Sequence, residues 1–149
     1  MKKLILPILF GVFTLSFSGK SISHKNCGPN FIFYNFPGMD PSHITLPVTQ
    51  IIIENLTWGT RTVHDNPTFP YYSGIVQGGW LKVSFVFDGS PYKACVYLED
   101  SNAECIQTQG TIVPDNSAAI TFSAFNCDQY YISINHLLSN ETCDCAGHP

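Results

Sequence analysis

Six cysteines are the residues of this 149-residue chain whose chemistry is most readily inferred. An even number of cysteines in a small chain with an export leader predicts disulfide bonds. Three bonds are expected, among Cys27, Cys95, Cys105, Cys127, Cys143 and Cys145.

One pairing is suggested by the spacing of Cys95 and Cys105. Both residues fall on the outward face of successive predicted strands, about equally far from a polar tip near Asp100. Side chains opposite each other on neighbouring strands lie close enough to form a disulfide. A cross-strand bond between Cys95 and Cys105 is therefore expected, although spacing alone leaves many connectivities open.

The close pair Cys143 and Cys145 cannot bridge itself without strain, so the two residues should reach different partners. The simplest partners are Cys27, near the start of the mature chain, and Cys127. A Cys-x-Cys pair with His148 nearby could alternatively form a metal or redox site. Because the cysteines of exported chains are usually oxidised, the disulfide interpretation is favoured.

The five histidines could support metal binding or acid–base chemistry, but their spacing fits no zinc motif. They are His24, His43, His64, His136 and His148. Removal of a leader after Ser23 would leave His24 at the N-terminus, where its amine and a second imidazole could hold copper. No Gly-x-Ser-x-Gly motif or glycine-rich phosphate loop is present. We expect no metal, no cofactor and no catalytic residue; the alternative is a small secreted enzyme or copper protein using histidines and carboxylates.

The polar tip at residues 99–104 carries oxygen ligands at alternate positions, in Asp100, Asn102 and Glu104. Calcium takes such ligands, but it usually needs about six oxygens. The glycine and the later glutamate of the helical calcium loop are also missing. The tip is therefore expected to be a solvated hairpin turn, not a calcium site.

Aromatic side chains gather in the predicted connection at residues 59–73 and just before it. Rings on a loop can stack on sugars or anchor a peptide, because each ring offers a large apolar area. The same rings could instead cap the open end of the core. If the protein has a ligand-binding surface, we expect it to include Trp58, Phe69, Tyr71 and Tyr72.

Two triplets fit the N-glycosylation motif, one beginning at Asn55 and the other at Asn140. Asn140 lies in a polar tail, whereas Asn55 ends an apolar predicted strand. Asn140 is therefore the better expected acceptor.

The first 18 residues read as a signal peptide, with Lys2 and Lys3 before an apolar run that is short for a membrane span. Cleavage is expected after Ser18 or Ser23, leaving residues 19–149 as one secreted, extracellular domain with no membrane span. Losing two of the 7 basic residues, against 11 acidic ones, gives the mature chain a net charge of about −6. This acidity argues against nucleic acid as a partner.

The elements that must hold these residues are strands. Residues 81–87 and 92–98 alternate between apolar and polar side chains, with turn residues Asp88-Gly89-Ser90-Pro91 between them. With a third run from Cys105, residues 79–109 predict a three-stranded meander. Further strands are expected at residues 30–36, 48–58, 118–125 and 130–135, with residues 59–73 as a long connection and a short strand possible at residues 74–77.

The pattern as a whole predicts an all-β protein, an antiparallel β-sandwich of seven or eight strands with three disulfides, immunoglobulin-like or jelly-roll in general form. A partly open barrel is the alternative fold. The expected function is non-enzymatic binding of an extracellular protein or glycan. A lipid carrier with an apolar cavity between its sheets is a further alternative.

Overall fold

The computed structural model describes residues 28–36, 46–89, 93–112, 116–125, 127–137 and 142–146. These residues form nine strands: β1 (Asn30–Phe36), β2 (Val48–Asn55), β3 (Thr60–Asp65), β4 (Tyr71–Ile75), β5 (Gly79–Phe87), β6 (Lys93–Glu99), β7 (Cys105–Ile112), β8 (Ser117–Ala124) and β9 (Gln129–Leu137). Within these ranges no helix is long and apolar enough to cross a membrane. Several predictions fall outside the described residues: the leader, His24, Cys27, His43, Asn140 and His148.

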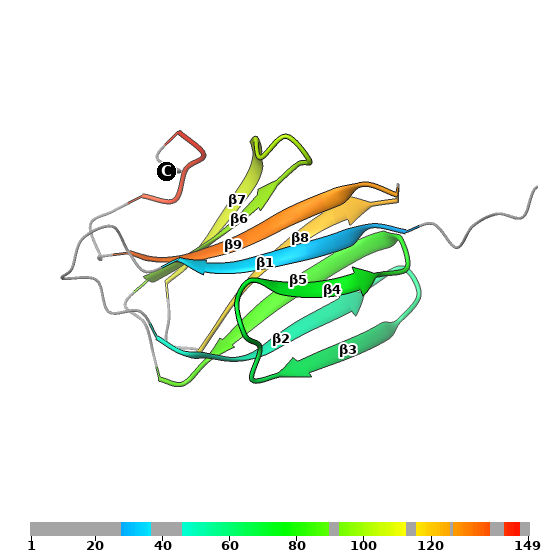
Figure 1. Ribbon diagram of the computed structural model, residues 1–149. Helices are drawn as coiled ribbons and strands as arrows, with labels where there is room; N and C mark the ends of the chain where they lie inside the picture. The colour runs from blue at the N-terminus through cyan, green and yellow to red at the C-terminus, as the bar shows by residue number, and fades with distance from the viewer. Residues whose placement is uncertain are drawn as a thin grey trace, which may run out of the picture.

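The strands form two sheets that face each other, as the two layers of Figure 1 show. Sheet A has the order β4-β1-β9-β6-β7, and sheet B has the order β3-β2-β5-β8. The predicted all-β class is confirmed. The antiparallel prediction is wrong for one pairing, because β1 and β9 run parallel. These are the first and last described strands, so the long chain between them removes the restriction that a short turn imposes on strand direction.

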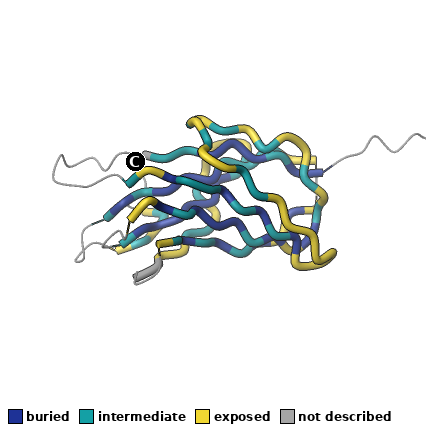
Figure 2. Tube along the Cα trace, turned by 90° about the horizontal axis from the view of Figure 1, so that it is seen from below, coloured by how far each residue is buried: buried dark blue, intermediate teal, exposed yellow. Residues whose placement is uncertain are grey.

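The core lies between the sheets, where alternation turns every second side chain inward. Leu81, Val83 and Phe85 of β5 are fully buried, and they face the buried Phe33 and Ile132 of sheet A. The rings of Phe33 and Phe85 meet edge to face with centroids 5.9 Å apart, which joins the two layers directly. Figure 2 shows the buried stretches along the strands and the exposed ones mainly at the turns.

The predicted three-stranded meander is wrong in its first step. β5 belongs to sheet B between β2 and β8, while β6 and β7 pair with each other in sheet A. The chain therefore changes sheets after Asp88, whose backbone N–H donates to the carbonyl of Pro47 (2.9 Å) and not across a hairpin. Alternation fixes which face of a strand is buried, but both sheets of this fold bury such a face, so the pattern fits either one.

The predicted long connection contains a strand, β3, and the first half of another, β4, which raises the number of described strands to nine. β3 is mostly exposed and pairs with β2 on one side only, as an edge strand. Because few of its side chains are buried, β3 lacks the apolar–polar alternation of a half-buried strand. The sequence therefore did not predict this strand.

Two disulfides link the C-terminal tail to the outer face of sheet A. Cys95 pairs with Cys143 and Cys105 with Cys145, with Cα atoms 5.7 and 5.5 Å apart. The expectation that the two tail cysteines take different partners is confirmed. The predicted Cys95–Cys105 bond is wrong.

The reason is the strand register, because Cys95 lies opposite Gly110 in β7 and Cys105 lies opposite Glu99. The predicted tail partners, Cys27 and Cys127, are wrong for the same reason: the tail runs along the β6–β7 hairpin. A third disulfide stays a prediction, since Cys27 lies outside the described residues.

Gly110 leaves the space that the Cys95–Cys143 bond occupies. A Cβ atom built on Gly110 would collide with the Cys143 sulfur and would lie 3.2 Å from the Cys143 Cβ. We expect Gly110→Ala to lower the free energy of unfolding by roughly 1–3 kcal/mol, measured by urea denaturation. In a Cys95→Ala/Cys143→Ala background the same substitution should cost less than about 0.5 kcal/mol. An equal cost in both backgrounds would show that the bond is not the cause.

Candidate functional site

A groove of about 230 Å³ opens between β3 of sheet B and β4 of sheet A. On the opposite side of the molecule the two edge strands are joined, because the Gln107 side chain of β7 donates to the Thr121 carbonyl of β8 (2.9 Å). The two sheets therefore part at the edge where β3 ends sheet B and β4 ends sheet A. The groove is lined by Ile53, Asn55, Thr60, Thr62, His64, Ser73, Ile75, Val76 and Gln77.

Strand alternation places three polar side chains of β3 on the groove side. Thr60, Thr62 and His64 line the groove, whereas Arg61 between them points to the outer face of sheet B and lies beside Glu54. The three lining residues of β3 therefore lie on one face of the strand, and the charged Arg61 lies on the other.

One end of the groove is closed by His64 and Tyr71. The Tyr71 hydroxyl and the His64 Nδ1 are 2.7 Å apart, and the two rings are in contact with centroids 5.0 Å apart. Tyr71 also packs against Phe33 of the core. This contact fixes the imidazole and leaves its Nε2 as the ring atom that can reach a ligand.

The other end is organised by Asn55, which is 3% exposed. Its Nδ2 donates to the carbonyl of Gln77 (2.8 Å), and its Oδ1 accepts from the backbone N–H groups of Thr57 and Trp58. The Trp58 Nε1 donates to the carbonyl of Gly78 (3.1 Å), while 59% of the residue stays exposed. An exposed indole is therefore held on Gly78, the residue that follows Gln77 of the groove lining.

The groove offers polar groups without net charge. Its described lining includes neither a carboxylate nor an ammonium group, and His64 is its one titratable side chain. In the described part of the chain, the side chains of Thr60, Thr62 and Gln77 make no hydrogen bond, so they can pair with a ligand. The Ser73 hydroxyl is used internally, since it accepts from the N–H of Phe31 and donates to the carbonyl of Gly74.

The four aromatic residues predicted to bind a ligand are placed in three settings. Trp58 is not among the lining residues, but its indole bonds to Gly78, the residue after Gln77 of the lining. Phe69 and Tyr71 pack against the core, as the capping alternative expected, and Tyr71 reaches the groove only through His64. Tyr72 is 63% exposed on the outer face of sheet A, opposite Ile32.

Sequence reasoning missed Thr60, Thr62 and His64 as a set. Their spacing of two residues was visible as Thr-Arg-Thr-Val-His. However, an alternating polar run predicts a shared face only once the segment is known to be a strand.

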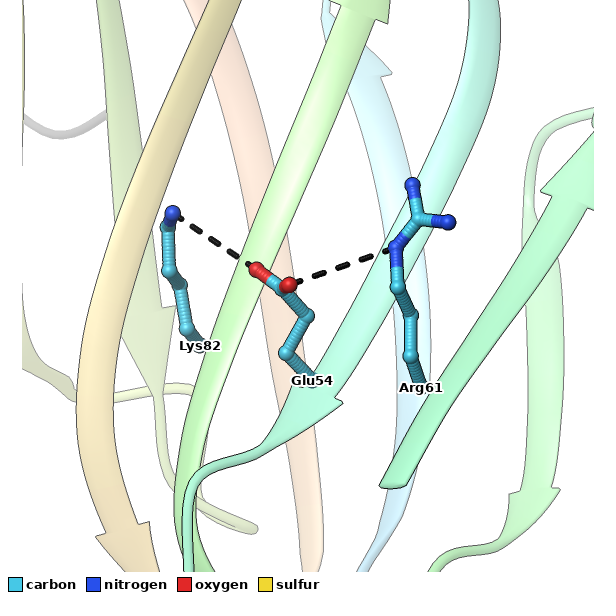
Figure 3. Close-up of polar contacts among 3 residues, drawn as sticks. All are labelled: Glu54, Arg61 and Lys82. Carbon is cyan, nitrogen blue, oxygen red and sulfur yellow. Dashed lines mark ion pairs between the residues drawn. The ribbon is translucent and has the colours of Figure 1, made fainter. Parts of the chain in front are cut away.

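The outer face of sheet B carries two of the basic residues. Glu54 lies between Lys82 (Nζ–Oε2 3.5 Å) and Arg61 (Nε–Oε1 3.9 Å), as Figure 3 shows. All three side chains are at least a third exposed, so each pair contributes about 0–1 kcal/mol. Their importance for the groove is that they hold both cations on the opposite face of the sheet.

The tip that resembled a calcium ligand set is a self-capped turn. The Asp100 Oδ1 accepts from the backbone N–H groups of Glu104 (3.1 Å) and Asn102 (2.8 Å), and these bonds hold the pKa of that carboxyl below its ordinary value. No group of three or more potential metal ligands comes together among the residues the structure describes.

The first glycosylation triplet places its acceptor inside the fold. The Asn55 Nδ2, to which a glycan would be attached, faces the Gln77 and Gly78 carbonyls. A glycan there would displace both bonds and the end of the groove.

Comparison of the chain with protein-family models, with curated proteins and with solved structures finds no match.

Proposed function

We propose that this protein is a secreted, non-enzymatic β-sandwich binding module for an extracellular protein or glycan, and that it binds its ligand at the groove with Trp58. The observation that carries the proposal is an exposed indole fixed on Gly78, next to Gln77 of an uncharged, hydroxyl-lined groove. Rigid aromatic side chains beside a concave polar surface are the usual anchors of recognition, because they bury a large area with little loss of conformational freedom.

The chemistry of the groove favours binding over catalysis. Acid–base catalysis on a bound ligand needs converging titratable groups, typically two carboxylates or a histidine with a nucleophile and an orienting acid. The described lining supplies His64 alone, and its Nδ1 is taken by Tyr71. The two disulfides of the tail support an extracellular setting, as does the apolar leader.

The test is a binding screen of the secreted protein on arrays of extracellular proteins and glycans, followed by tryptophan variants. Trp58→Ala should weaken binding of the captured ligand by at least about tenfold, as loss of an anchor side chain does. Trp80→Ala is the matched control, because Trp80 is 54% exposed and its neighbour Leu81 faces the core, which turns the Trp80 side chain to the outer face of sheet B. It should change the affinity by less than about twofold. Equal losses in the two variants, or loss with Trp80→Ala alone, would contradict the proposed site.

A further inference from the structure

We propose that the groove between β3 and β4 takes a neutral sugar ring of a glycan, a ligand class that rests on the binding function proposed above and narrows it. Three properties of the groove select this class: the hydrogen-bonding groups it leaves available, its apolar surfaces and its lack of charge.

The available polar groups match a ring of hydroxyls. The hydroxyls of Thr60 and Thr62 each donate and accept, the Gln77 amide does both, and the His64 Nε2 adds a fourth group. A sugar hydroxyl likewise donates and accepts, so the sugar hydroxyls can form hydrogen bonds with these groups in place of those they lose to water. Asn55 is not among these groups, because its amide already bonds to the backbone on both sides; it keeps the end of the groove in place.

The apolar surfaces match the C–H faces of a sugar. Ile75, which is 68% exposed, and Val76 line the groove, and the exposed Trp58 indole is held on Gly78, next to the lining residue Gln77. Aromatic rings stack on such C–H faces and hold them without requiring a charge. The volume of about 230 Å³ is below that of a pocket for a drug-sized molecule, so it suits one ring of a longer chain.

The charge distribution selects against acidic sugars. A carboxylate or sulfate that enters the groove loses water, and the described lining has no cation to replace it. Arg61 and Lys82 lie on the other face of sheet B beside Glu54, and the whole chain has a net charge of −4. The field of the protein therefore adds repulsion to the desolvation cost.

A peptide added as an extra strand fits this edge less well. The β1–β4 pairing shifts register between Asn30 and Ile32, and Gly74 in β4 has a φ of 72°, outside the strand region. A short, irregular edge offers few evenly spaced backbone groups to an incoming strand. Peptide binding is nevertheless an outcome that the experiment below detects.

The experiment is an NMR titration of the isotope-labelled mature protein with four neutral probes, the methyl glycosides of glucose, galactose, mannose and N-acetylglucosamine. Methyl glucuronide serves as the acidic analogue, and an unstructured tetrapeptide serves as the peptide probe. At least one neutral probe should shift the amide signals of Thr60, Thr62 and Gln77 and the Trp58 indole signal. Methyl glucuronide should bind at least fivefold more weakly than methyl glucoside.

Two variants of the same strand make the matched comparison. Thr62→Val keeps the shape of the side chain and removes its hydroxyl, so it should weaken the neutral probe at least fivefold. Arg61→Ala changes the opposite face of β3 and should leave the affinity within twofold. Amide spectra of the free variants establish that both are folded, and a Thr62→Ser variant should restore binding if the hydroxyl is what matters.

Three results would overturn the inference: no neutral probe shifts the groove signals, the glucuronide or the peptide binds best, or Arg61→Ala weakens binding as much as Thr62→Val. These results leave the proposed function standing if Trp58→Ala still weakens capture of the array ligand at least about tenfold and Trp80→Ala does not. Failure of that tryptophan test would instead remove the proposed function itself.

Discussion

Replacing His136 with leucine is expected to raise the free energy of unfolding at neutral pH and to flatten its dependence on pH. His136 is 3% exposed in the core, its ring meets Phe87 edge to face (centroids 5.1 Å apart), and neither ring nitrogen has a hydrogen-bond partner among the described residues. Leaving such atoms unpaired costs roughly 1–3 kcal/mol, which leucine would recover in part.

The pH dependence follows from the same burial. Desolvation lowers the pKa of His136 from 6.5 to about 4, so the unfolded chain binds a proton between these values that the folded chain does not. Above pH 6.5 the ring is neutral in both states and the proton does not affect stability, whereas the folded state loses stability relative to the unfolded chain as the pH falls from 6.5 towards 4. A lowering of this size corresponds to about 3 kcal/mol.

The measurement is urea denaturation of the wild type, His136→Leu and His136→Gln at intervals from pH 7 to pH 4. The difference in unfolding free energy between wild type and either variant should change by about 3 kcal/mol over this range, because neither replacement titrates. His136→Gln keeps a polar side chain, so it should share the flat profile without the gain at neutral pH. A constant difference across the range would show that the ring is hydrated or paired in solution.

Removing the disulfides of the tail should give the largest loss of stability. The Cys95–Cys143 bond spans 48 residues, and in the chain-entropy account an isolated bond of this span contributes about 4 kcal/mol. In the native protein the Cys105–Cys145 bond lies beside it, so the second bond closes an effective loop of only about 12 residues and contributes roughly 3 kcal/mol.

Alanine pairs separate these contributions. Cys95→Ala/Cys143→Ala and Cys105→Ala/Cys145→Ala should each lose roughly 3 kcal/mol, and the variant lacking both bonds should lose roughly 7 kcal/mol. Tryptophan fluorescence in urea reports the unfolding, and thiol titration establishes that the remaining cysteines stay oxidised. A loss below about 1 kcal/mol in the variant lacking both bonds would mean that the tail does not constrain the unfolded chain.

The candidate site combines a residue that the sequence predicted, Trp58, with a residue whose role the sequence did not predict, Asn55. Trp58 was predicted because it lies near a loop rich in aromatic residues, and such rings can stack on sugars or anchor a peptide. Its value depends on Asn55, which looked like a glycosylation acceptor and instead holds Gln77 and Gly78 against the indole. The hydrogen bonds from Asn55 to the Gln77 and Gly78 carbonyls join residues more than twenty positions apart, and no local pattern encodes them.

The sequence by itself determined what depends on neighbouring residues. Alternation along residues 81–87 specified a strand and its buried face, since successive side chains of an extended chain point to opposite sides. The even number of cysteines specified oxidation, and the spacing of Cys143 and Cys145 ruled out a bond between them.

Only the tertiary structure decided which elements meet. Sheet membership of β5, the partner of Cys95 and the parting of the sheets at β3 and β4 all depend on pairing between distant segments. A strand buries its apolar face equally well against many partners. The partner is selected by the combined packing of the whole core, to which each residue adds only a small share.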